Sequence, residues 1–329
     1  MKILIVLLVL LVSSSMGQVT EQWVQRYCGP GSSSDGGSAL KVDNDGNVFI
    51  LGTTSNGSTT DFITIKYNSS GVMQWLQIYD GTGNSVDRGS AITIDEEGNV
   101  YVSGFSTGVG SRYDFATIKY DSLGILKWVQ RYNGPGGMDD MPAAISVDNS
   151  GNVYVTGWCS AGVLFDDYAT VKYNSEGVLQ WIQRYNGTGS NQDQARSIAI
   201  DVTGNVYVTG SSYGITSGYD YATVKYNPLG DSLWVRRYNG QVGGADGASL
   251  ISIDPQGNII VAGNSEGSNL LDTNSDFVTI KYNSAGVQQW VQRYAGPSNR
   301  YDDINALDVD VLGNVYITGL SNGFMTSWD

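Results

Sequence analysis

The stretch VDNSGNVYVTG, Val147 to Gly157, decides the fold because close variants of it recur along the chain. The other copies are VDNDGNVFILG, IDEEGNVYVSG, IDVTGNVYVTG, IDPQGNIIVAG and VDVLGNVYITG. An Asp or Asn at the start, followed by a Gly where φ turns positive, is typical of a hairpin turn. The β-branched and aromatic residues that follow are typical of a strand. The motif therefore predicts one hairpin, built six times.

A tryptophan recurs with this motif at a nearly constant period. Consecutive members lie 52, 53, 53, 53 and 56 residues apart, at Trp23, Trp75, Trp128, Trp181, Trp234 and Trp290. Internal periods of this size are typical of propellers and solenoids. The length varies only between the Gly that ends the motif and the Asp that opens a second recurring stretch, DYATVKY in the third unit.

Each unit contains four short segments with strand composition. In the third unit we predict strands at 144–148, 152–157, 168–173 and 181–185, and we call such strands a, b, c and d. Alternation places bulky side chains on both faces of strands c and d. A repeated four-stranded sheet with two faces to cover predicts a propeller blade packed between its neighbours. We therefore predict an all-β chain, a β-propeller of four-stranded antiparallel blades with five complete units, an N-terminal strand (EQWVQRY) and a partial sixth unit.

The pattern AISVDNSGNVYVTG…DYATVKYNSEGVLQW resembles the seven-bladed β-propeller repeat family, SBBP, found mainly in exported bacterial proteins. The resemblance covers nearly all of the chain after the first residues. It implies a propeller and a secreted or cell-surface setting. It implies no reaction, and it assigns no catalytic residue.

The two ends of the chain carry separate expectations. Residues 1–17 have a lone Lys2, an apolar run and small residues near Gly17, which is typical of a signal peptide cleaved near Gly17–Gln18. Residues 18–329 are predicted to form one β-propeller domain of ~53-residue repeats. Asp329 aligns with the Asp that opens strand c in earlier units, so we expect the chain to be a piece truncated at its C-terminus.

Composition excludes several classes of function. The net charge is −14, which argues against a nucleic-acid partner. No later apolar run reaches the ~20 residues of a membrane span. The chain has no His, so His-based triads and His metal sites are excluded, and we expect no cofactor. Cys28 and Cys159 occupy different positions of different repeats, which favours two unpaired cysteines over a disulfide.

Recurring charged residues have a structural and a functional interpretation. Turn formation explains the DNSGN motif without a ligand. Only the first copy, with Asp43 and Asp45, is a weak candidate for a cation site. An Asp also follows each Trp by 12 residues, and we favour backbone capping by it over a ring of ligand-binding carboxylates. The recurring Lys of strand c and Arg of strand d are predicted to pair with acids of neighbouring blades.

The b–c and d–a connections hold the variable segments, so ligand-binding residues are expected on this face. Phe105 and Trp158 follow strand b in adjacent units and are candidates for an aromatic platform. Asp139 with Asp140, and Asp302 with Asp303, are doubled acids whose alternatives are solvated loop residues or paired catalytic carboxylates.

Two functions remain open at this point. The favoured one is a non-enzymatic, exported binding or structural module that recognises a protein or a glycan through the variable loops. The alternative is a propeller-type glycan hydrolase or lyase that uses loop carboxylates. The turns lack the SxDxGxTW boxes expected of a sialidase-type propeller, and fold analogy does not choose between the two.

Overall fold

The computed structural model describes residues 21–29, 34–160, 165–189, 191–240, 243–267, 275–296 and 301–322. Strands and turns account for the secondary structure of these residues. Five four-stranded antiparallel sheets and one two-stranded sheet make up the fold. In these ranges there is no helix of the length and apolar character that a membrane span requires. The predicted signal peptide, 1–17, lies outside the described residues.

We number the sheets in chain order as blades one to six and keep the letters a to d for their strands. Blade one contains β1 (Gly36–Val42), β2 (Val48–Ser55), β3 (Thr60–Tyr67) and β4 (Met73–Tyr79). Blade two contains β5 (Asp87–Ile94), β6 (Val100–Thr107), β7 (Tyr113–Tyr120) and β8 (Leu126–Tyr132). Blade three contains β9 (Asp140–Val147), β10 (Val153–Ser160), β11 (Asp166–Tyr173) and β12 (Leu179–Tyr185). Blade four contains β13 (Asp193–Ile200), β14 (Val206–Gly214), β15 (Gly218–Tyr226) and β16 (Ser232–Tyr238). Blade five contains β17 (Asp246–Ile253), β18 (Ile259–Glu266), β19 (Ser275–Tyr282) and β20 (Gln288–Tyr294). Blade six contains β21 (Asp302–Val309) and β22 (Val315–Ser321).

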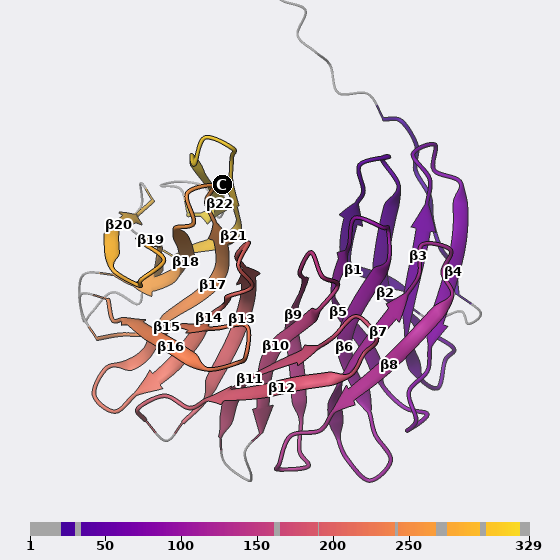
Figure 1. The fold of residues 1–329 in the computed structure, drawn as a ribbon, viewed down its shortest axis with the longest axis horizontal. Helices are drawn as coiled ribbons and strands as arrows, with labels where there is room; N and C mark the ends of the chain where they lie inside the picture. The colour runs from indigo at the N-terminus through magenta and orange to yellow at the C-terminus, as the bar shows by residue number, and fades with distance from the viewer. Residues whose placement is uncertain are drawn as a thin grey trace, which may run out of the picture.

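The blades follow one another around an arc (Figure 1). Strands a lie toward its middle and strands d on its outside, and the strands a of successive blades contact each other. Blade one and blade six lie at the two ends of the arc, on either side of its open part. This is the predicted propeller, with five four-stranded blades and a sixth of which two strands are described.

Apolar side chains gather between neighbouring blades. One cluster joins Tyr101 and Phe115 of blade two to Val153 and Val171 of blade three. Every residue of β11 after the first is buried, so both faces of this strand are covered as predicted. The core is therefore a series of layers between blades, and each blade depends on its neighbours for burial.

Strands a and b are joined with an irregularity in register, which explains the Gly that ends the repeated motif. In blade three the shift lies between Thr156 and Gly157 of β10. A Cβ on Gly157 would lie 2.1 Å from the carbonyl oxygen of Met141 in β9. No side chain fits so close a backbone approach.

The a–b turn is held by the Asp at the start of the motif. Asp148 Oδ1 accepts hydrogen bonds from the backbone N–H groups of Ser150 (2.9 Å) and Asn152 (2.9 Å). Its Oδ2 accepts from the Asn152 amide (2.8 Å) and from the Tyr154 hydroxyl (2.9 Å). Gly151 has φ of 74°, which favours glycine. Turn chemistry therefore explains the motif, as predicted.

The substitution Asp148→Ala removes all four acceptor contacts and is expected to lower the free energy of unfolding by about 2 kcal/mol. Asp148→Asn is the matched control, because its amide oxygen can still accept from the turn, and it should cost less. Urea denaturation of both variants measures the difference. An alanine variant as stable as the parent would contradict the assignment of the turn to this side chain.

The recurring Trp joins each blade to the next. The Trp128 indole Nε1 of blade two donates to the Ser175 carbonyl oxygen in the c–d turn of blade three (3.0 Å). Its ring centroid lies 6.1 Å from that of Tyr173, and a Cβ on Gly177 would lie 2.8 Å from the ring. Equivalent indole bonds are Trp75 to Ser122, Trp181 to Pro228 and Trp234 to Ser284.

The N-terminal strand predicted at EQWVQRY is not formed in the structure. Residues 21–29 form no strand, although Trp23 donates to the Ser69 carbonyl oxygen (3.1 Å) and packs near Tyr67 as the later Trp residues do. A strand d takes its ladder bonds from strand c of its own blade, and within the described residues no strand c lies beside this segment.

Candidate functional site

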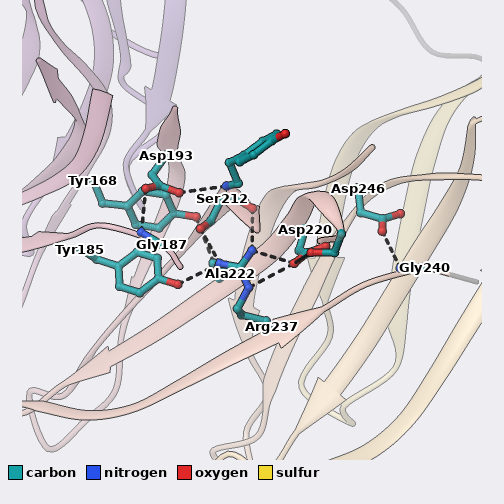
Figure 2. Close-up of polar contacts among 12 residues, drawn as sticks. Tyr168, Tyr185, Gly187, Asp193, Ser212, Asp220, Ala222, Arg237, Gly240 and Asp246 are labelled. Atoms are coloured by element: carbon teal, nitrogen blue, oxygen red, sulfur yellow. Dashed lines mark hydrogen bonds and ion pairs between the residues drawn. The ribbon is translucent and has the colours of Figure 1, made fainter. Parts of the chain in front are cut away.

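An Asp at the start of each strand a holds the connection that precedes it, and in blades two to six this Asp is buried. Asp193 accepts hydrogen bonds from the backbone N–H groups of Gly187 (2.7 Å) and Tyr213 (3.0 Å), as Figure 2 shows. Burial raises the pKa of Asp193, and these hydrogen bonds act in the opposite direction. The same carboxylate-to-glycine bond occurs at Asp35–Gly29, Asp87–Gly81, Asp140–Gly134, Asp246–Gly240 and Asp302–Gly296. The capping interpretation is confirmed by these bonds.

The Arg of strand d connects its own blade to the previous one. Arg237 of blade four forms an ion pair with Asp220 (2.7 Å) and donates to Ser212 Oγ (2.5 Å). It also donates to the Tyr185 hydroxyl of blade three (3.1 Å). In Figure 2 the Asp220 carboxylate lies between Arg237 and Asp246 of blade five. The acid partner is therefore in the same blade, whereas the sequence predicted an acid of a neighbouring blade.

The Lys of strand c was predicted to pair with acids, and in four blades it does not. Lys172 Nζ donates to the Pro228 carbonyl oxygen of the next blade (3.1 Å) and lies over the Tyr154 ring. Lys66, Lys119 and Lys225 make the same kind of bond to Ser122, Ser175 and Ser284. Lys281 alone among these forms an ion pair, with Asp254 of its own blade (2.7 Å). Where a complete blade follows, the Lys of strand c donates to a carbonyl oxygen in the c–d turn of that next blade.

The two cysteines are unpaired, as predicted. Cys28 is exposed, and Cys159 is buried beneath Tyr132, whose hydroxyl donates to its sulfur at 3.8 Å. Burial raises the pKa of the Cys159 thiol to about 11. A buried thiol with a raised pKa is structural rather than reactive.

The weak cation candidate uses its oxygens within its own turn. Asp43 Oδ1 accepts from the backbone N–H groups of Asp45 (3.0 Å) and Asn47 (2.8 Å). Asp43 Oδ2 accepts from the Asn47 amide (2.8 Å). Three of the four contacts of Asp148 in blade three recur here, so the described contacts of Asp43 are those of a turn residue.

The doubled acids divide into one buried and one more accessible side chain. Asp140 and Asp302 are fully buried, and both cap backbone N–H groups. Burial raises the pKa of Asp140 to about 6, against the lowering effect of the hydrogen bonds it accepts. Asp139 forms an ion pair with Arg112 of blade two (3.2 Å), and Asp303 accepts from the Asn264 amide (2.9 Å).

The two aromatic candidates lie at equivalent positions of adjacent blades. Phe105 is in β6 and Trp158 is in β10, and both side chains are half-buried. The Phe105 ring lies 4.7 Å from that of Tyr113, centroid to centroid. In blades four and five the same position holds the shorter side chains Ser211 and Asn264.

A groove of about 480 Å³ occupies the loop face, on the side of the b–c and d–a connections, where these shorter side chains stand. It lies across blades four and five, and its walls include Gln192, Gln194, Ser211, Tyr219, Asn264, Glu266 and Tyr301. The groove was not predicted from the sequence. Its signal is the change from Phe or Trp to Ser and Asn at one repeat position, which leaves space beside the loops.

Comparison with known proteins agrees with this geometry. The family model SBBP, a β-propeller repeat, matches residues 180–215 and 289–324. These two segments are therefore SBBP β-propeller repeats, as the resemblance predicted. Each matched segment begins one residue before a recurring Trp and runs through strands a and b of the next blade.

Solved structures are similar to this chain at low sequence identity. A polysaccharide lyase, an ulvan lyase, is 11% identical with a TM-score of 0.50, and the match covers 86% of this chain and 76% of the lyase. A glucose dehydrogenase is 9% identical with a TM-score of 0.44, covering 87% and 96% of the two chains. A eukaryotic initiation factor is 8% identical with a TM-score of 0.45, and the match covers 80% of this chain and 55% of the factor. No curated protein matched the sequence.

Proposed function

We propose that this propeller is a non-enzymatic binding module that recognises a glycan through its loop face. The observation that carries the proposal is the groove across blades four and five. Tyr219 and Tyr301 offer ring surfaces there, and Gln192, Gln194 and Asn264 offer amides. Aromatic rings with a few polar groups beside them suit the flat faces and hydroxyls of sugars. A protein segment is the other ligand class that this face can take.

The positions of the doubled acids support binding over hydrolysis. Glycoside hydrolysis needs two carboxyl groups that face the same bond from about 5 to 9.5 Å apart. Asp140 and Asp302 are buried beneath the loops that they cap, so each pair presents one carboxylate to solvent at most. Of these, Asp139 is held by Arg112 and Asp303 by Asn264.

Export of the protein is part of this proposal. The signal-like residues 1–17 support secretion or display at a cell surface, where glycans and protein partners are available. A glycan array and a peptide array, probed with the purified protein beside a panel of glycosidic substrates, test the proposal. Specific binding without turnover is expected, and turnover of any glycan would contradict the non-enzymatic assignment.

Phe105 and Trp158 do not line the groove, and their role as a second contact for the ligand is tested by the double substitution to Ala. Affinity for the ligand is expected to fall by about 1–3 kcal/mol, which is typical of aromatic anchors, with unfolding nearly unchanged. Titration calorimetry measures the affinity. Val202→Ala is the control, because Val202 is an exposed residue in an a–b turn on the opposite face. Equal affinity in the double variant and the parent would remove these two residues from the site.

A further inference from the structure

The junction between blades one and two departs from the other junctions. In the later blades the Asp that opens the DYATVKY stretch of strand c forms an ion pair with the Arg of strand d. These pairs are Asp114–Arg131, Asp167–Arg184, Asp220–Arg237 and Asp276–Arg293. In blade one the acid is Asp61 and the Arg position is Ile78. Asp61 is therefore a buried carboxylate without its arginine.

A second change stands two residues beyond the first. The later strands d run into RYNG or RYAG, whereas blade one has IYDG, with Asp80 in place of the neutral residue. The equivalent positions are Asn133, Asn186, Asn239 and Ala295. The same short segment has thus lost a positive charge and gained a negative one.

These changes bring three carboxylates together. Carboxylate oxygens of Asp61, Asp80 and Asp87 all lie within 4.8 Å of one another. Asp61 is 7% exposed, its Oδ1 has no hydrogen-bond partner, and no ion pair reaches it from the described residues. In the later blades Oδ1 of this Asp is also without a partner, but its Oδ2 is held by the Arg. Asp61 alone in this series lacks that second contact.

The other two ligand groups are placed differently. Asp87 is fully buried, and its oxygens accept from the backbone N–H groups of Gly81 (2.7 Å) and Thr107 (3.1 Å), which fixes its orientation. Asp80 is exposed, so the cluster is open to solvent on that side. Burial, followed by the charges of Asp80 and Asp87, raises the pKa of Asp61 to about 6.

Charge counting indicates what completes the cluster. At each later junction two Asp and one Arg leave a formal charge of −1, whereas Asp61, Asp80 and Asp87 sum to −3. A divalent cation returns the sum to −1. Carboxylates beside one another in a buried place require such compensation, because the cost of unpaired buried charge is high.

We propose that Asp61, Asp80 and Asp87 bind one calcium ion, which takes the place of the missing arginine between blades one and two. Calcium binds oxygen ligands at about 2.3–2.6 Å, so oxygens on opposite sides of the ion lie about 4.6–5.2 Å apart. Carboxylate oxygens that all lie within 4.8 Å of one another can share one such ion, and calcium accepts a flexible ligand geometry whereas magnesium demands a near-ideal octahedron. Water on the exposed Asp80 side completes the coordination.

The test is calorimetric titration of the purified, EGTA-treated protein with calcium chloride, together with thermal unfolding. One calcium ion per chain is expected, and at a hundredfold excess over Kd the Tm should rise by about 5 °C. Asp61→Asn should abolish the titration heat and the rise in Tm. Asp43→Asn with Asp45→Asn is the matched control and should leave both unchanged.

The decisive variant is Ile78→Arg with Asp80→Asn, which installs the pair found at the later junctions. Val278 stands opposite Arg293, so the β-branched Ile63 opposite residue 78 leaves room for the guanidinium. This variant should fold, reach the Tm of the calcium-loaded parent without calcium, and show no calcium response. The proposal is overturned if the parent shows no calcium response, if this variant or Asp61→Asn responds as the parent does, or if magnesium gives an equal shift.

Discussion

Replacing Arg237 by methionine is expected to lower the free energy of unfolding by about 3–5 kcal/mol. Methionine fills the space of the aliphatic stem but leaves Asp220 buried beside Asp246 with no positive charge. It also leaves the Ser212 hydroxyl and the Tyr185 hydroxyl without the donor that joins blades three and four. Equilibrium denaturation in guanidinium chloride measures the loss.

Two further variants separate charge from packing at this junction. In Arg237→Met with Asp220→Asn the buried charge is gone, and more than half of the lost stability should return. Arg196→Met is the control, because Arg196 is exposed and should change stability by less than about 0.5 kcal/mol. A cost for Arg237→Met as small as this control would show that the ion pair contributes nothing to the junction.

Trp128→Ala is expected to cost about 3 kcal/mol, which is near the lower end for removal of a large core aromatic because the ring is only half-buried. The variant loses the contacts with Tyr101 and Tyr173 and the hydrogen bond to the Ser175 carbonyl oxygen. The ring also fills the space above Gly177. Thermal and chemical unfolding measure the change.

The matched control is Trp158→Ala, which makes the same substitution at the loop face of the neighbouring blade. Within the described part of the chain Trp158 donates to no c–d turn, so the control should leave stability nearly unchanged. A cost below 1 kcal/mol at Trp128, or equal costs at the two positions, would contradict the role of the recurring Trp as an inter-blade contact.

Much of the fold could be predicted from the sequence, because the same turn and strand residues recur at the same positions of each repeat. The Asp and Gly of the DNSGN turn and the Trp period predict hairpins and blades directly. The Gly157 position was visible as a repeated residue, but its cause, the close approach of the Met141 carbonyl, depends on a register shift that periodicity does not show.

The site was less predictable, because it depends on which side chains the arc brings together. The aromatic candidates Phe105 and Trp158 were identified from departures in the repeat. The groove across blades four and five was not, because its lining comes from several loops and two blades. The missing Arg at Ile78 was visible in the sequence, but only the folded chain brings Asp80 and Asp87 beside Asp61.

The interlocking of Trp128 with Gly177 and its equivalents has a consequence for how such chains change length. Since successive junctions reuse one set of contacts, no junction specifies how many blades the chain contains. Loss or duplication of a whole unit between the second and fifth would bring together two surfaces that already fit. The junction with Ile78 and Asp80 is the exception on the side of blade one alone, because Asp87 of blade two has an equivalent at the start of every other strand a.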